Sequence, residues 1–254
     1  MSEQSVYLSV VIPSYNEMKN LKRGVLEEVY EFLSKQEFTW EILLTDDGST
    51  DGTVDVLAKF AQEHKEARLL ANHHMGKGPT VSAGMLATLG EYRLFTDFDQ
   101  STPISEVLRA FSFLKEGYDI VIGSREASGA YRDEEPVLRH VMGRVFNIFV
   151  QILALRGIQD SQCGFKLFSA EATVKLFPAL VVYGGQKTRK DAFTGAFDVE
   201  LLFLARKWKY KVKEMGVSWK HNETDRISAA RDSLRMLRDI MRIRKAWLLG
   251  KYNK

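Results

Sequence analysis

The amino-acid sequence predicts an α/β protein whose mainly parallel sheet has helices on both faces. Short apolar or β-branched runs alternate with stretches of helical periodicity through the first half of the chain, a pattern typical of a parallel sheet covered on both sides. A length of 254 residues, with 45% hydrophobic and 27% charged residues, suits one such domain of a globular protein. We expect that domain to span residues 1–220 and a basic helical tail to follow at 221–254.

Strands are expected where apolar runs are continuous and end in turn-forming residues, at 7–12, 41–45, 67–71, 92–96 and 118–122. Helices are expected at 16–35, 53–65, 80–89, 136–155 and 197–207. The carboxyl ends of parallel strands meet at one edge of a sheet, where open α/β proteins bind their ligands. Polar residues that directly follow the strands are therefore the first candidates for a site.

Two acidic motifs follow expected strands, and the first is Asp97-Phe98-Asp99, after the strand at 92–96. Two aspartates separated by one residue suit Mg²⁺ or Mn²⁺, because such an ion takes one or two carboxylates and completes its shell with water and phosphate oxygens. The alternative is that both are solvated loop residues. A second acidic loop at the end of another strand favours the metal site.

That second loop runs from Asp46 to Thr53, after the strand at 41–45. Aspartate and glycine favour turns, and Asp51 or Thr53 can cap the next helix, so turn chemistry accounts for the second half of the loop. It does not account for the adjacent carboxylates of Asp46 and Asp47. A carboxylate at this edge can accept hydrogen bonds from a base N–H group or from ribose hydroxyls, which favours a nucleotide site.

The segment Gly76-Lys77-Gly78 precedes the helix at 80–89. Lys77 suits a phosphate there, although such tripeptides are also common in turns. The spacing of a Walker A loop is absent, and the first turn lacks the Gly-x-Gly-x-x-Gly motif, which argues against a dinucleotide dehydrogenase. The neighbouring His73 and His74 have no cysteine cluster beside them and are interpreted as loop residues.

The second half of the chain supplies three more polar candidates. Arg125 follows the strand at 118–122 and can balance phosphate charge. Asp160 and Gln162 lie in a loop between two apolar stretches, where they either form a turn or face the site. Cys163 is the single cysteine, so no intrachain disulfide forms and a reducing compartment is expected.

Membrane contact is expected to be peripheral, since the start of the chain lacks a signal peptide's basic segment and no stretch reaches the ~20 apolar residues of a spanning helix. The whole-chain charge of +3 is too small to predict a nucleic-acid partner. Residues 226–254, however, contain nine basic and two acidic residues, a net charge of +7. This basic amphipathic helix and the apolar helix at 136–155 suit a membrane surface. The alternative is that both pack in the core or in a homodimer interface.

Taken together, these segments resemble the inverting glycosyltransferases of the GT-A fold, a Rossmann-like α/β fold, and among them the polyprenyl-phosphate sugar transferases. The widely shared motifs are Leu8–Glu17, Asp46–Thr53, Gly76–Gly78 and Asp97–Asp99. Later segments narrow the resemblance to the dolichyl-phosphate β-glucosyltransferases: Ile122–Arg125, Asp160–Phe168 and Phe197–Leu202. The string Asp160–Phe168 is the most specific of them.

The resemblance implies a role for each candidate. The nucleoside would be held by Pro13, Tyr15, Glu17, Asp46 and Asp47. Lys77 would lie near the base or the diphosphate, and Asp97 and Asp99 would bind the diphosphate and a metal ion, Mg²⁺ or Mn²⁺. The catalytic group, facing the sugar and the acceptor phosphate, would be Arg125, Asp160 and Gln162.

Departures from the family pattern leave the donor sugar open. Phe98-Asp99-Gln100-Ser101 stands where members often have Ala-Asp-Gly-Ala, Gly195-Ala196 where an Arg-Trp pair is common, and His221 where an acidic residue is expected. The hydrophobic N-terminal anchor of eukaryotic members is also missing, so we expect another route to the membrane.

The predicted reaction is transfer of a sugar, with inversion, to a polyprenyl or dolichyl phosphate, and UDP-glucose is the preferred donor. The second pKa of a phosphate monoester is about 6, so the acceptor is already ionised near neutral pH. It can therefore attack the anomeric carbon without a strong general base. The alternatives are a GDP-mannose donor, a soluble acceptor, or a non-catalytic nucleotide-sugar-binding protein. The protein is expected to be cytoplasmic and peripheral on the cytoplasmic face of a membrane.

Overall fold

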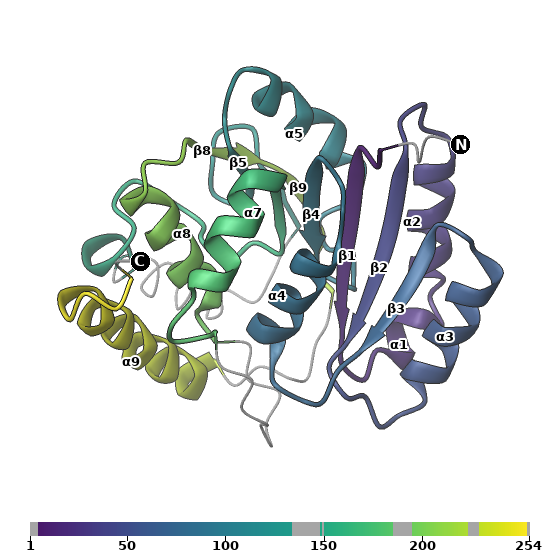
Figure 1. Ribbon diagram of the computed structural model, residues 1–254, viewed down its shortest axis with the longest axis horizontal. Coiled ribbons are helices and arrows are strands. Elements are labelled where there is room, and N and C mark those ends of the chain that lie inside the picture. Colours follow the sequence, from purple (N-terminus) through teal and green to yellow (C-terminus); the bar gives the residue numbers. More distant parts are fainter. Residues whose placement is uncertain (1–4, 134–147, 149, 185–194, 223–228, 253–254) are drawn as a thin grey trace.

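The structure, a computed structural model, describes residues 5–133, 148, 150–184, 195–222 and 229–252. Its main strands are β1 (Leu8–Ser14), β2 (Trp40–Asp46), β3 (Ala67–Ala71), β4 (Tyr92–Thr96), β5 (Ile120–Ser124), β7 (Phe165–Ser169) and β8 (Val212–Gly216). They form one seven-stranded sheet in the order β3-β2-β1-β4-β7-β5-β8 (Figure 1). All neighbours are parallel except β7, which is antiparallel to β4 and β5. The mainly parallel sheet that the sequence predicts is confirmed.

Helices cover both faces of this sheet, also as predicted. One face packs against α2 (Val25–Ser34), α3 (Thr53–Glu63) and α5 (Glu106–Lys115). The other packs against α4 (Lys77–Ala87), α7 (Ala170–Leu176) and α8 (Phe197–Lys207), and α4 and α7 stand in front of the sheet in Figure 1. Val10 and Val11 in β1 point to opposite faces, and both are fully buried. Continuous apolar strands are what a sheet covered on both sides requires.

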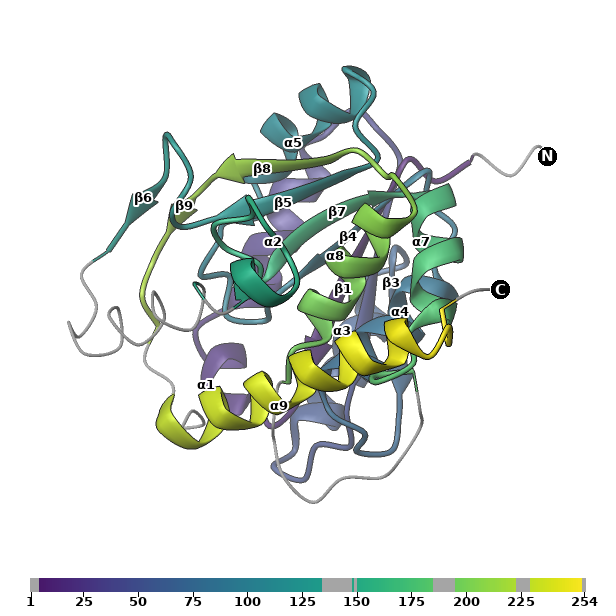
Figure 2. The same cartoon turned by 90° about the vertical axis from the view of Figure 1, so that its left-hand side faces the viewer.

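The C-terminal helix α9 (Ala229–Leu248) lies on the outside of α8 (Figure 2). It packs through Ile240 and Ile243, which are fully buried. On its other side Leu234, Met241 and Leu248 are 70%, 54% and 78% exposed. Their seven-residue spacing is two helical turns, so they form one line along the helix. The helix therefore has one packed apolar face and one exposed apolar line.

Shorter elements complete the fold. Helix α1 (Met18–Leu21) precedes α2, and the 3-10 helix η1 (Phe177–Ala179) follows α7. A small parallel sheet pairs β6 (Tyr131–Arg132) with β9 (Ser218–Trp219). Within the described ranges, the helices fall short of the length and hydropathy needed to span a bilayer.

Several element boundaries differ from the prediction. The strands at 67–71 and 92–96 and the helix at 197–207 begin and end as predicted. The single helix predicted at 16–35 is wrong, because Gly24 adopts φ = +75°, a left-handed conformation that separates α1 from α2. The helix expected at 80–89 begins already at Lys77, and the strand expected at 118–122 lies at Ile120–Ser124.

Three elements were not predicted from the sequence: α5, α7 and β8. Of the apolar helix predicted at 136–155, residues 136–147 and 149 lie outside the described residues. In the remainder, Val150 and Leu155 are fully buried, whereas Ile148 and Ile152 are 54% and 74% exposed. This end of the predicted helix therefore packs on one side only.

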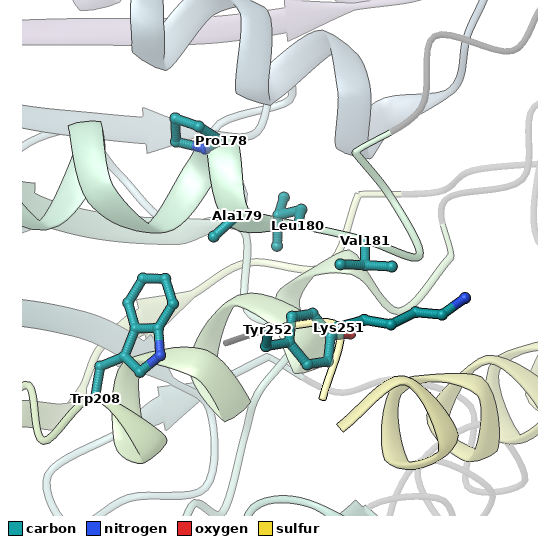
Figure 3. A pocket seen from close by; sticks show the side chains of 7 residues that line it. All are labelled: Pro178, Ala179, Leu180, Val181, Trp208, Lys251 and Tyr252. Carbon is teal, nitrogen blue, oxygen red and sulfur yellow. The ribbon is translucent and has the colours of Figure 1, made fainter. Parts of the chain in front are cut away.

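A small hollow lies where the end of the chain meets η1 (Figure 3). Its lining residues are Pro178, Ala179, Leu180, Val181, Trp208, Lys251 and Tyr252. Its volume of about 60 Å³ has room for a few water molecules. A nucleotide sugar needs far more space, so the hollow is not the donor site.

Candidate active site

The polar candidates gather at the carboxyl edge of the parallel strands. Tyr15, Asp47, Asp97 and Arg125 directly follow β1, β2, β4 and β5. Because these strands are parallel, their ends lie along the same edge of the sheet. This edge is the usual ligand-binding position of an open α/β sheet.

The antiparallel strand β7 brings the later loop to the same edge. Phe165, the first residue of β7, pairs with Thr96, the last residue of β4. One residue further out, the N–H group of Asp97 donates to the carbonyl oxygen of Gly164 at 2.9 Å. The loop with Asp160 and Gln162 directly precedes β7, so both halves of the predicted site meet here.

An ion pair between Asp97 and Lys77 lies at the centre of this edge. The Nζ atom of Lys77, the first residue of α4, is 2.5 Å from Oδ1 of Asp97. Asp99 accepts a hydrogen bond from the N–H group of Ser101 at 2.9 Å. Burial, and then the charge of Asp97, raise the pKa of Asp99. The two carboxylates therefore repel each other, and a cation between them would relieve that repulsion.

These two residues fit the predicted divalent cation. In the part of the chain that the structure describes, no group of three or more His, Cys, Asp and Glu side chains is arranged to hold a metal ion. As predicted from the sequence, Asp97 and Asp99 would offer two carboxylates, and water and phosphate oxygens would complete the shell. Mg²⁺ is commonly held in this way, by one or two carboxylates together with a substrate's phosphates.

Asp47 organises the loop that carries Lys77. Its Oδ1 atom accepts hydrogen bonds from the N–H group of Met75 at 2.7 Å and from the hydroxyl of Thr80 at 2.7 Å. Its Oδ2 atom accepts from the N–H group of Gly76 at 2.9 Å and lies 2.8 Å from Nδ1 of His74. The carboxylate thus fixes the start of α4.

The neighbouring Asp46 is fully buried and shapes its own turn. It accepts hydrogen bonds from the N–H group of Ser49 at 2.8 Å and from the hydroxyl of Ser14 at 3.0 Å. The adjacent carboxylates that turn chemistry left unexplained therefore have structural partners in different directions. Their nucleoside-binding role is a prediction beyond these contacts.

Tyr15 and His74 form a flat aromatic pair at the β1 end of the site. Their ring centroids are 4.3 Å apart with an interplanar angle of 10°. Glu17, two residues after Tyr15, is buried and accepts a hydrogen bond from the side chain of Asn20 at 2.6 Å. Pro13 lies within β1 and is buried. His74 was interpreted from the sequence as a loop residue, and its contacts with Asp47 and Tyr15 place it beside the candidate site.

Arg125 and Asp160 meet in the second half of the site. Asp160 accepts hydrogen bonds from Nε, Nη2 and the backbone N–H group of Arg125 at 2.7, 2.9 and 3.0 Å. Burial raises the pKa of Asp160, but Arg125 outweighs it and holds that pKa at about 2. The guanidinium carbon of Arg125 also lies 5.6 Å from the ring centre of Trp219, within range of a cation–π interaction.

Gln162 connects this loop to the C-terminal helix. Its backbone N–H group donates to Oδ1 of Asp160 at 3.2 Å, and its side-chain amide lies 3.0 Å from Sδ of Met236 in α9.

Cys163 is buried, and burial raises the pKa of its thiol to about 11. The thiol is therefore protonated at neutral pH, which gives it the character of a packing residue.

Sequence reasoning missed two charged residues beside the site, Lys166 and Asp198. Both belong to segments that resemble the glucosyltransferases, yet neither was assigned a role. Nζ of Lys166 is 2.6 Å from Oδ1 of Asp198, and the two side chains are 0% and 5% exposed. The available signal was the presence of charges in two mainly apolar segments, one in Phe165–Phe168 and two in Phe197–Leu202.

Comparison with known proteins agrees with this geometry. The family model for glycosyl transferase family 2 matches residues 9–177. A dolichyl-phosphate beta-glucosyltransferase of Dictyostelium discoideum is 34% identical over 260 residues, covering 97% of this chain and 76% of that protein. The human protein of the same name is 32% identical over 262 residues, covering 96% of this chain and 76% of its own.

Solved structures share the fold at lower sequence identity. Glucosyl-3-phosphoglycerate synthase from Mycobacterium tuberculosis, solved with Mn²⁺, UDP and glucosyl-3-phosphoglycerate, has a TM-score of 0.61 at 16% identity and covers 97% of this chain and 80% of that one. Mannosyltransferase PcManGT from Pyrobaculum calidifontis, solved with GDP-Man and Mn²⁺, has a TM-score of 0.57 at 17% identity and covers 98% of this chain and 74% of its own. With a family model over more than half of its length and relatives over nearly all of it, the chain belongs to glycosyl transferase family 2, as a GT-A-fold enzyme of the dolichyl-phosphate β-glucosyltransferase type.

Proposed function

We propose that the protein transfers glucose from UDP-glucose to a polyprenyl phosphate such as dolichyl phosphate, with inversion at the anomeric carbon. The observation that carries the proposal is the pairing of Arg125 with Asp160 at the sheet edge that holds Asp97. Asp160 lies in the segment most specific to the dolichyl-phosphate β-glucosyltransferases, the relatives that match this chain over nearly its full length.

The chemistry suits a site without a strong general base. An oxygen of the acceptor phosphate attacks the anomeric carbon, and the bond from that carbon to the UDP oxygen breaks. The bonding electrons leave with UDP, and no proton has to move because the acceptor is already ionised at neutral pH. The protein's contribution is then to align the two phosphates and to stabilise the charge that grows on the departing diphosphate.

The residues divide into a donor group and an acceptor group. Toward the donor, Lys77 would face the diphosphate, with Asp97 and Asp99 holding a divalent ion whose chemistry, when bound, is to neutralise the leaving diphosphate. The nucleoside would lie against Pro13, Tyr15, Glu17, Asp46 and Asp47. Toward the acceptor, Arg125 would attract the phosphate, Asp160 would fix the orientation of Arg125, and Gln162 would contact the sugar.

A peripheral position on the cytoplasmic face of a membrane is part of the proposal. The exposed line of Leu234, Met241 and Leu248 is flanked by basic side chains on the same outer side of α9. These exposed basic residues are Arg235, Arg238, Arg242 and Lys245. Apolar side chains among basic ones suit a helix that lies in the interface of an anionic membrane.

The test is transfer of labelled sugar to an organic-soluble product. Purified protein would be incubated with Mg²⁺ or Mn²⁺, a polyprenyl phosphate, and either labelled UDP-glucose or labelled GDP-mannose. We expect metal-dependent transfer from UDP-glucose that Asp99→Ala abolishes. Transfer from GDP-mannose alone would make the protein a mannosyltransferase. Binding of UDP-glucose without transfer to the lipid would point to a soluble acceptor or to a non-catalytic binding protein.

A further inference from the structure

Two charged side chains lie in the core beside the site without a part in the proposed reaction. Lys166 in β7 is fully buried, and Asp198 in the first turn of α8 is 4% exposed. They form an ion pair of 2.6 Å without hydrogen-bond geometry, while Nζ of Lys166 donates to the carbonyl oxygen of Cys163 at 2.6 Å. A buried ion pair is weak evidence for stability, because desolvation of both charges offsets their attraction.

This pair lies next to Lys77. The ammonium groups of Lys77 and Lys166 are 6.0 and 5.2 Å from the centre of the same ring, that of Phe95. The start of α4 also packs directly on the start of α8, since a Cβ atom on Gly78 would lie only 2.8 Å from Cβ of Phe197. Lys77 and Asp198 are therefore neighbours across this contact.

The electrostatic interactions follow the same arrangement. Lys77 pairs with Asp97 and Lys166 pairs with Asp198, so two ion pairs lie on the same ring, that of Phe95. On the other side, the charge of Lys166 helps Arg125 to lower the pKa of Asp160. Anions and cations thus alternate from the sheet edge through the buried pair and back, in the order Asp97, Lys77, Asp198, Lys166, Asp160 and Arg125.

We propose that Asp198 is a positioning residue of the donor site, which holds Lys77 in place when Lys77 leaves Asp97 to make room for a divalent cation. The inference rests on the proposed function. Nζ of Lys77 lies 2.5 Å from Oδ1 of Asp97, so it occupies part of the carboxylate that Asp97 would offer to a bound cation. Without a second anion, Lys77 would stay on Asp97 and compete with the cation.

Lys166 has a supporting part in this arrangement. It balances part of the charge of Asp198, so that this third carboxylate competes less with Asp97 and Asp99 for the divalent ion. Lys77 is then held between Asp97 and Asp198, and its ammonium group stays at the sheet edge where the donor's diphosphate would lie.

The test is Mn²⁺-dependent binding of UDP, measured by calorimetry on the full chain. In Asp198→Asn, we expect the dissociation constant of UDP in the presence of Mn²⁺ to rise about tenfold, the loss of one charge-assisted contact. The KM for UDP-glucose should rise similarly, whereas the KM for the polyprenyl phosphate should not change. The matched control is Glu171→Gln, which removes a carboxylate from the exposed pair with Lys175 and should bind UDP as the wild type does.

A double-mutant cycle separates positioning from a structural effect. If Asp198 acts through Lys77, Asp198→Asn should add little to the loss already seen in Lys77→Met. If the two losses in affinity are simply additive, Asp198 does not act through Lys77 and the proposal is wrong. An Asp198→Asn protein that binds UDP as tightly as the wild type would overturn it as well.

A third variant distinguishes the loss of a positioning role from a loss of stability. Lys166→Met/Asp198→Leu replaces the buried pair with apolar side chains, a change that often restores stability. We expect its melting temperature to match or exceed that of Asp198→Asn while its affinity for UDP with Mn²⁺ stays low. Recovery of wild-type affinity would show that the charges have no positioning role. Failure of the wild type to bind UDP with Mn²⁺ would instead count against the proposed function.

Discussion

Arg125 donates three hydrogen bonds to the carboxylate of Asp160, two from its guanidinium group at 2.7 and 2.9 Å and one from its backbone N–H group at 3.0 Å. The carboxylate therefore fixes both the end of β5 and the direction of the side chain. The Asp160 side chain is only 5% exposed, so solvent screens these contacts weakly. Protonation of Asp160 at low pH should therefore lower the stability of the fold.

The first prediction concerns stability in acid. The pKa of Asp160 is about 2 in the folded protein, against an ordinary value of 3.8. The stabilisation is therefore fully present above about pH 4 and is lost as the pH falls towards 2, and it amounts to about 2 kcal/mol. Asp160→Asn lacks this contribution at every pH.

Urea unfolding of the wild type and of Asp160→Asn at pH 5, 4 and 3 would measure the effect. We expect the wild type to be the more stable protein at pH 5. About half of the 2 kcal/mol linkage should be lost by pH 3, so the gap narrows by about 1 kcal/mol. If the free energy of unfolding changed with pH in the same way for both proteins, the low pKa of Asp160 would be contradicted.

The second prediction concerns the backbone beside Asp97, in the proposed metal site. A Cβ atom on Gly164 would lie 1.9 Å from Oδ2 of Asp97, so Gly164→Ala must push this carboxylate aside. A displacement of about 1 Å in such a site costs on the order of a hundredfold in rate, and we expect that loss in kcat/KM for UDP-glucose. The binding of Mn²⁺, followed by electron paramagnetic resonance, should weaken as well.

The matched control is Gly117→Ala. Gly117 has φ = +88° and nothing within 4 Å of an added Cβ atom, so alanine there strains the backbone far from Asp97. It should lower the stability by about 1 kcal/mol and leave kcat/KM unchanged. Equal activity of Gly164→Ala and Gly117→Ala would show that the position of Asp97 does not limit the reaction.

The sequence predicted those parts of the fold that local patterns determine. The strands at 67–71 and 92–96 were predicted to the residue because each is a short apolar run between polar turns. The direction of β7 was not predicted, since an apolar strand has the same appearance in either direction. That direction matters, because it puts the loop with Asp160 at the site.

The candidate site divides in the same way. Asp97 and Arg125 were found because each follows a strand, a relation that the sequence reveals. The pairing of Arg125 with Asp160 joins residues 35 positions apart, and no local pattern specifies such a contact. Lys166 and Asp198 were missed because a buried charge is interpretable only when its partner is known.

The third prediction tests the exposed face of α9. The double substitution Leu234→Ser/Leu248→Ser should weaken binding to liposomes that contain anionic lipid at least about tenfold, because each leucine loses about 1.5–3 kcal/mol of burial in the interface. Binding should also fall with added salt, since the basic side chains between them contribute electrostatically. Flotation assays with and without salt would measure both effects.

The matched control for α9 is Leu89→Ser. Leu89 is 79% exposed, close to the 78% of Leu248, but it follows α4 and lies outside α9. Its loss should leave liposome binding unchanged. An equal effect of the two changes, or no effect of the α9 change, would remove α9 from the membrane contact.

A buried tyrosine ties α9 to the start of α8. The hydroxyl of Tyr183 donates to Asp239 in α9 and accepts a hydrogen bond from the N–H group of Ala196 at 2.6 Å. A second tyrosine, Tyr252, donates to Glu200 at 2.6 Å. Burial, and then the neighbouring carboxylates, raise the pKa of both tyrosines, so both hydroxyls stay protonated and act as donors at neutral pH.

The fourth prediction is that the hydroxyl of Tyr183 stabilises the fold more than that of Tyr252. Tyr183→Phe leaves two buried groups, Asp239 and the N–H of Ala196, without this partner, and should cost about 2–3 kcal/mol. Tyr252→Phe should cost only about 1 kcal/mol, because Glu200 keeps three backbone donors at 2.7, 2.8 and 2.9 Å. Urea unfolding of both variants would rank them. The reverse order would mean that the end of the chain, rather than the middle of α9, fastens this helix to the domain.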